Sequence, residues 1–403
     1  MDLVGERYYK LNKILLLCLG LWPYQSPILK KLQIVFFQTL FLSFLVCQLN
    51  TFFVKQYNID LVLKVSILAN FMTSSFATFY FVLIGLGVIS TSISCVNVKE
   101  LLDRVQHDWR TLKDKKECEI VQYYTIIGMR YTIVFFATSF PLLFCFIFGF
   151  YLPGFLDLVR PLNESRSRRL PILAEYYVLD EEKHFYPILV HQSLLALLGV
   201  TTVLATETLN MVCIHHACGL FEVASYRLKH AFDDVSSWMC DGEKHTAIRA
   251  RIVEVVNIHR RSIDFLDYLL STFIFTYLVV LILGVIAITI NMFRLIEAIL
   301  ALNDFEELLA AGAFIAGQYG FLFFANYFGQ KVTNHSIIVF DEAYDVPWYS
   351  APVQIQKLLT FILQRTVKGY VLGIGGIIMA SLEGFASMAS LTLSYLTVIY
   401  SVR

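Results

Sequence analysis

Ionisable side chains inside long apolar stretches are the residues of this chain best suited to chemistry. Glu383 lies in the middle of the apolar stretch 367–400, while Arg130 and Glu207 lie nearer the ends of two other stretches. A charge among apolar residues is costly unless it meets a partner, a cavity or water. We therefore expect Glu383 to line a water-filled path, and Arg130 and Glu207 to form an ion pair with a structural role.

The motif Cys213-Ile214-His215-His216-Ala217-Cys218 contains side chains that can ligate metals. Adjacent side chains on a helix point about 100° apart, so His215 and His216 do not easily face one ion. We predict no metal site here, but a packed histidine pair and reduced cysteines. The sequence has no nucleophile–base constellation and no glycine-rich phosphate cradle, so it predicts neither an enzyme nor a cofactor.

A stripe of small polar and apolar side chains runs along the end of the chain. Leu391, Ser394, Val398 and Val402, with Ser401 alongside, are three or four residues apart and fall on one face of a helix. Such a face suits a pore with a hydrophobic constriction. The same stripe would also serve as ordinary helix packing, so the pattern alone leaves both interpretations open.

These residues lie in a chain with the composition of a membrane protein. Of its 403 residues, 57% are hydrophobic and 16% are charged, whereas soluble domains carry roughly 25% charged residues. Lys+Arg and Asp+Glu both number 32, so no net charge favours nucleic acid. An all-α polytopic protein is predicted, with seven transmembrane helices in stretches long enough to cross a bilayer: 31–54, 59–93, 122–152, 186–214, 265–300, 308–340 and 367–400.

The loop charges predict the orientation. Lys and Arg are concentrated before residue 31 and in the alternate connections that follow, which predicts a cytoplasmic N-terminus and an extracellular C-terminus. The sequon Asn163-Glu164-Ser165 falls in a predicted outer loop, as glycosylation of Asn163 requires. No cysteine lies in an outer loop, so no extracellular disulfide framework is predicted.

The segments between the spans are organised as follows. Residues 1–30 form a cytoplasmic N-terminus with a short interfacial or re-entrant segment, because the apolar run within Lys10–Trp22 is too short to span. Residues 31–218 hold the first four spans, and 265–340 hold the fifth and sixth. Apolar positions recur at helical spacing in 219–264, which predicts that the fourth and fifth helices continue into the cytosol and present a subunit interface there.

Short motifs resemble those of the insect odorant receptor family. They include Leu21-Trp22-Pro23, Cys218-Gly219-Leu220-Phe221, Tyr327-Phe328-Gly329, Ala343-Tyr344-Asp345-Val346-Pro347-Trp348-Tyr349, Ser381-Leu382-Glu383-Gly384-Phe385 and Ser394-Tyr395. The resemblance extends over essentially the whole chain and is most specific in the last part, which looks most like the receptors of ants, bees and wasps.

This resemblance implies an odorant-specific subunit of a ligand-gated, non-selective cation channel. Such subunits assemble with a shared co-receptor as heterotetramers in the plasma membrane of olfactory neuron dendrites, surrounded by lipid. Residues 369–403 would then hold the pore-lining helix, with Val398 and Val402 as gate and Ser401 at the outer mouth. Cytosolic parts 219–264 and 341–368 would form the anchor between subunits. The short 230–250 connection marks a tuning subunit and not the co-receptor.

In the family, a small volatile or hydrophobic ligand binds in the outer half of each subunit. Carried to this chain, the expected wall is apolar with a few hydrogen-bonding groups. The candidates are Leu68, Phe71, Met72, Ser139, Leu142, Phe146, Leu198, Thr202, Phe314 and Gln318.

Three other interpretations remain at this point. The chain is alternatively a metabotropic seven-helix chemoreceptor, a channel resembling gustatory receptors, or a scaffold subunit without a ligand. The sequence identifies neither the ligand nor the subunit ratio, and it leaves open whether a homomer conducts.

Overall fold

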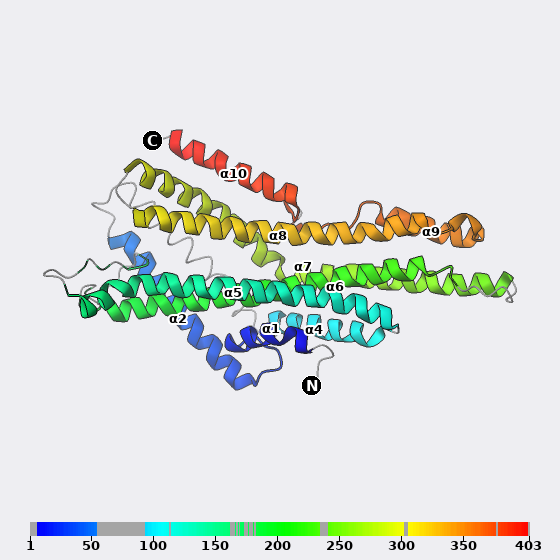
Figure 1. The fold of residues 1–403 in the computed structure, drawn as a ribbon, viewed down its shortest axis with the longest axis horizontal. Coiled ribbons are helices and arrows are strands. Elements are labelled where there is room, and N and C mark those ends of the chain that lie inside the picture. The colour runs from blue at the N-terminus through cyan, green and yellow to red at the C-terminus, as the bar shows by residue number, and fades with distance from the viewer. Residues whose placement is uncertain are drawn as a thin grey trace.

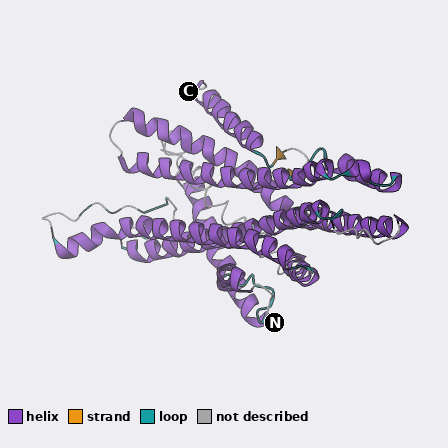
Figure 2. Ribbon diagram, turned by 45° about the vertical axis from the view of Figure 1, so that its right-hand side comes forward, coloured by secondary structure: helices purple, strands orange, loops and turns teal. Residues whose placement is uncertain are grey.

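The computed structural model is a bundle of long helices (Figure 1). It describes residues 6–54, 93–112, 114–161, 166, 168, 170–172, 176, 180, 183–233, 241–301, 305–375 and 378–401. Figure 2 shows that nearly every described residue is helical, apart from a pair of short strands. The predicted all-α fold is confirmed.

The elements follow one another with mostly short connections. In chain order they are α1 (Glu6–Cys18), α2 (Pro27–Val54), α4 (Ile93–Thr111), α5 (Lys115–Val159), α6 (Phe185–Lys229), α7 (Asp241–Ala301), α8 (Phe305–Asp345), the 3-10 turn η1 (Trp348–Ser350), α9 (Val353–Thr366), β1 (Gly373–Ile374), β2 (Ile378–Met379) and α10 (Leu382–Ser401). The two strands pair antiparallel, with Gly373 opposite Met379.

Five of the described helices are long and apolar enough to cross a membrane. The qualifying segments are Pro27–Cys47, Lys115–Val159, Phe185–Lys229, Tyr277–Leu300 and Leu382–Ser401. The predicted stretch 308–340 lies in α8, a helix of 41 residues that is not among these five segments. The predicted stretch 59–93 falls almost entirely outside the described residues, so the total of seven crossings stays a prediction.

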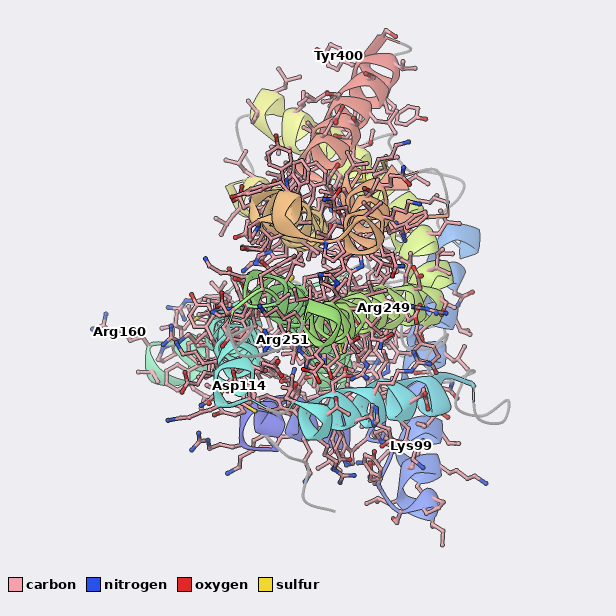
Figure 3. All side chains as sticks on the ribbon, turned by 90° about the vertical axis from the view of Figure 1, so that its right-hand side faces the viewer. Lys99, Asp114, Arg160, Arg249, Arg251 and Tyr400 are labelled. Atoms are coloured by element: carbon pink, nitrogen blue, oxygen red, sulfur yellow. The ribbon has the colours of Figure 1, made fainter. Side chains whose placement is uncertain are left out.

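The long helices run back and forth along one axis. In Figure 1, α5 and α6 lie in a middle layer, with α1 and α4 on one side and α8, α9 and α10 on the other, while α2 crosses the middle layer and α7 passes from it towards α10. Figure 3 looks along this axis and separates the same layers, with Lys99 of α4 on one side and Tyr400 of α10 on the other. The helices meeting between the layers enclose the candidate site.

The helix α10 begins later than predicted. The described residues 367–375 and 378–381 are not helical as expected; they include a turn and the paired strands β1 and β2. Gly369 and Gly375 have φ of 59° and 61°, a left-handed backbone that interrupts a helix and that glycine adopts without strain. The hydroxyl of Ser381 then accepts a 3.0 Å hydrogen bond from the backbone N–H of Gly384, so Ser381 caps the start of α10.

The fourth and fifth helices extend beyond the predicted spans, since α6 continues to Lys229 and α7 begins at Asp241; the cytosolic location of these extensions stays a prediction. We expected the apolar residues of 219–264 to need a second subunit to cover them, and this is wrong for most of them. Phe221, Ile252 and Val255 are buried within this single chain. The helices α8 and α9 supply the missing partner, because Val339 and Leu359 belong to the same buried cluster.

The N-terminal helix α1 packs onto the bundle. Its leucines Leu15 and Leu16 are buried. The side-chain amide of Asn12 donates to the Thr208 hydroxyl of α6 at 2.9 Å. These contacts attach α1 to the helix that carries much of the candidate site.

Candidate functional site

A cavity of about 490 Å³ lies among α5, α6, α7 and α8. The β1–β2 hairpin and α10 contribute to the same wall through Leu372, Ile378, Ala380 and Met388. The volume falls within the roughly 300–1,000 Å³ typical of small-molecule sites. Most of the helical wall is apolar, as in Phe135, Leu142, Val203, Leu204, Met211, Ile214, Leu269, Leu270, Val280, Leu281, Phe321, Phe324 and Phe328.

Three polar side chains form one connected group on this wall. The amide nitrogen of Asn210 donates to the hydroxyl of Tyr277, and that hydroxyl donates to a carboxylate oxygen of Glu207 at 3.3 Å. Glu207 and Asn210 face the cavity from α6, being three residues apart, and Tyr277 faces it from α7. An otherwise apolar cavity with one polar group suits a hydrophobic molecule that carries a single polar atom.

The cavity reaches the start of α10. Asn326 lines the wall and its amide oxygen accepts a 3.1 Å hydrogen bond from the backbone N–H of Ser381, the capping residue of α10. Next to it, a Cβ added at Gly329 would lie 2.2 Å from the carbonyl oxygen of Ala380. Glycine at position 329 therefore lets α8 approach the β2–α10 connection closely.

The helix α10 has one face towards the bundle and one face away from it. Thr392 is buried and shares a 2.6 Å hydrogen bond with the hydroxyl of Tyr319 on α8. The predicted stripe lies on the opposite face: Leu391, Ser394 and Ser401 are exposed, and Val398 is 57% exposed. Val402 lies outside the described residues.

Glu383 is not in the middle of a helix as predicted. It is an exposed residue in the first turn of α10. The prediction is wrong because the hairpin replaces the first half of the expected helix. A carboxylate in this position interacts favourably with the positive end of the helix dipole.

Two of the predicted ligand residues lie on the cavity wall. Ser139 and Leu142 line it from α5, with Leu142 70% exposed in the single chain. Thr202 instead bonds its hydroxyl to the Leu198 carbonyl; Thr202 directly precedes Val203, the first α6 residue of the wall, and Leu198 lies more than one turn before it, so neither belongs to the wall. Phe146, Phe314 and Gln318 are also absent from the wall, and Leu68, Phe71 and Met72 lie outside the described residues.

The described cavity is deeper than the predicted outer-half site. Its α6 wall begins at Val203 and ends at Ile214, which is the inner part of the predicted span 186–214. The contributions of Tyr277 and Asn326 were missed because they depend on how α7 and α8 pack, which periodicity does not reveal. In this polar group, Glu207 was the only residue whose place in the sequence predicted a polar neighbour, since a carboxylate in an apolar stretch requires one.

The predicted ion pair between Arg130 and Glu207 is wrong. Arg130 is exposed on α5, and Glu207 accepts the hydrogen bond from Tyr277 described above. Gly128 is the residue of this turn that faces α6, since its added Cβ would lie 3.2 Å from Val212. Arg130 follows two residues later, about 200° around the helix, and points away.

The paired histidines face different elements, as predicted. His216 makes a 3.0 Å contact through Nε2 with a carboxylate oxygen of Asp108 on α4. His215 lies 3.2 Å from the Nζ of Lys331 on α8. Among the described residues there is no group of three or more metal-ligating side chains. The pair therefore joins α6 to two neighbouring helices.

Known proteins share both the sequence pattern and the fold. A family model described as 7tm Odorant receptor matches residues 67–393. Odorant receptor 22c of Drosophila melanogaster is 24% identical over 187 residues, or 46% of this chain and 45% of that receptor. The match thus spans less than half the length of this curated relative.

The similarity to solved structures covers nearly the whole chain. The insect olfactory receptor OR5 from Machilis hrabei in complex with eugenol is similar with a TM-score of 0.69 and 14% identity, over 99% of this chain and 98% of that one. A second structure of the same receptor gives a TM-score of 0.67 at 15% identity, with the same coverage.

The bundle of long apolar helices defines a multi-pass membrane protein. The chain belongs to the odorant receptor family, whose model matches most of its length. The resemblance stated from the sequence motifs is thereby confirmed.

Proposed function

We propose that this chain is an odorant-specific subunit of a ligand-gated, non-selective cation channel. The observation that carries the proposal is the continuous wall between the cavity and the start of α10, formed by Asn326, Ala380 and Met388. A molecule that fills the cavity touches the residues that hold this helix. The binding energy of the ligand is then available to shift α10 between two positions.

The exposed stripe of α10 lines the pore in this proposal. The described residues of the stripe are exposed in the single chain. The opposite face of α10 bonds Tyr319 of α8 through Thr392 and lines the cavity through Met388. Copies of the helix from four subunits would enclose a path in which Val398 and Val402 form a ring. A narrow apolar ring excludes water and ions until it widens.

The assembly is a heterotetramer with the family's co-receptor. The end of the bundle formed by α7, α8 and α9 contributes the contacts between subunits. Aromatic residues remain exposed there after the single chain has folded, among them Tyr344, Tyr349 and Phe361. Exposed apolar patches of this kind are typical of protein interfaces. The channel resides in the plasma membrane of olfactory neurons.

Permeation tests the pore assignment. The double variant Val398→Ala plus Val402→Ala is co-expressed with the co-receptor, and whole-cell currents are recorded during application of volatile ligands. We expect a larger current without ligand and a change in relative cation permeability, because the ring is wider. Leu393→Ala is the matched control, since Leu393 is exposed on another face of α10. Unaltered permeation in the double variant would exclude α10 of this subunit from the pore.

A further inference from the structure

One side-chain acceptor on the cavity wall has no partner. Asn210 is 3% exposed and lines the cavity. Its amide nitrogen is occupied by the Tyr277 hydroxyl, while its amide oxygen Oδ1 is buried without a hydrogen bond from any described residue. Asn210 is the only described wall residue that has a buried side-chain oxygen or nitrogen without a hydrogen-bond partner. Such an atom is destabilising until a donor reaches it.

Three other polar residues of the wall, Thr138, Thr208 and Asn326, are engaged by the protein itself. Asn326 donates to the Leu322 carbonyl and accepts from Ser381. Thr208 donates to the Leu204 carbonyl at 2.6 Å and accepts from Asn12 at 2.9 Å. Among these residues, the Oδ1 of Asn210 is therefore the buried polar atom that remains available to a ligand.

The chemistry of this polar group favours ligands that donate a hydrogen bond. The hydroxyl hydrogen of Tyr277 is directed to Glu207, so the atom that this group leaves unpartnered is an acceptor, the Oδ1 of Asn210. An ether, aldehyde or ester carries acceptors only and cannot pair with it.

We propose that the cavity selects volatile alcohols or phenols, and that the ligand hydroxyl donates to Oδ1 of Asn210. This inference rests on the proposed function, because it names the ligand class of the same site. The apolar remainder of the wall accommodates the hydrocarbon part of the ligand. Asn210 is the residue that determines specificity between a hydroxyl and its methyl ether.

A panel of matched ligand pairs tests the proposal on the unaltered chain. Each aliphatic alcohol of six to twelve carbons, and each of a set of alkylphenols, is compared with its O-methyl ether in cells that co-express the chain and the co-receptor. We expect responses to concentrate among the hydroxyl compounds, with each ether about 10- to 100-fold weaker, as the loss of one buried hydrogen bond predicts. Equal or stronger responses to the ethers would overturn the inference.

Two variants assign the preference to the residue. In Asn210→Leu, which keeps a similar volume without the acceptor, we expect the half-maximal alcohol concentration to rise by about 10- to 100-fold, while the ether response changes little. Gln318→Leu is the matched control: it removes another amide with an unpartnered buried oxygen, but one that is not on the wall. Its hydroxyl preference should equal that of the unaltered chain. A preference that persists in Asn210→Leu overturns the assignment.

Failure of the proposed function has a different signature. Surface labelling verifies that each chain reaches the membrane, and a direct agonist of the co-receptor verifies that the channels conduct. Silence to every hydroxyl compound and every ether, with both controls positive, contradicts the proposed function and this inference with it. Responses to ethers alone contradict only the inference. If Asn210→Leu does not reach the surface, the ligand pairs on the unaltered chain still decide the ligand class.

Discussion

Ser381 holds the start of α10 through two hydrogen bonds. Its backbone N–H donates to Asn326 of α8, and its hydroxyl accepts from Gly384 within α10. The first bond joins α10 to the cavity wall, and the second closes the first turn of the helix. The helix cap and the connection to the ligand site thus meet in one residue.

Replacing this serine tests the connection. Ser381→Ala removes the cap, which stabilises a helix by about 1 kcal/mol, and we expect a higher ligand concentration for half-maximal current at equal surface expression. Concentration–response curves measured beside surface biotinylation check this. Ser390→Ala is the matched control, because Ser390 is an exposed serine within the same helix. Identical curves for the two variants would separate Ser381 from gating.

Gly329 provides a second residue-scale test, because a side chain there would collide with the carbonyl oxygen of Ala380. Gly329→Ala must push α8 away from the β2–α10 connection, and we expect loss of ligand-evoked current or of surface protein. By contrast, a Cβ at Gly312 of the same helix meets nothing within 4 Å. Gly312→Ala should be tolerated and stabilise α8 by roughly 0.5–1 kcal/mol. Equal behaviour of the two alanine variants in current and surface assays would refute the close approach.

At the scale of elements, His259 of α7 lies where this helix meets α6 and α9. Its ring lies 5.5 Å from the ring of Phe221 on α6. Burial, and in second place the charge of Arg365 on α9, lower the pKa of His259 from an ordinary value of 6.5 to about 4. The folded helices therefore hold this imidazole in its neutral form.

This depressed pKa predicts a loss of stability in acid. The unfolded chain takes up a proton near pH 6.5, whereas the folded chain resists it until about pH 4. Stability from this residue is thus complete above pH 6.5 and declines as the pH falls towards 4. Thermal unfolding of the purified protein should show a smaller decrease in Tm over this range for His259→Gln than for the unaltered chain. Parallel curves for both proteins would reject this origin of the pH dependence.

The elements themselves were largely predictable, and the exceptions have physical causes. Apolar stretches such as 122–152 and 186–214 are long enough to specify a helix locally, and they lie within α5 and α6. The last long helix begins only at Leu382 and not at residue 367 as expected, because left-handed glycines, the β1–β2 pair and the Ser381 cap set its start. Hydropathy alone does not register such local backbone geometry.

At the scale of the whole molecule, the cavity was only partly predictable. Ser139 and Leu142 were named from the depth of their helix, and they do line the wall. Asn210, Tyr277 and Asn326 were not named, because they meet only when three helices pack together. The outer stripe of α10 was visible in the sequence because its spacing is local. What the stripe faces depends on neighbouring subunits.

The central claim is that ligand binding and ion conduction belong to one membrane assembly. The most direct measurement applies a responding volatile ligand to an excised patch that contains this chain and the co-receptor, with no GTP or ATP on either side. The account predicts channel opening within milliseconds, unaffected by a non-hydrolysable GDP analogue. A current that disappears on excision and returns only when GTP and cytosol are supplied would contradict it, and would favour a metabotropic receptor.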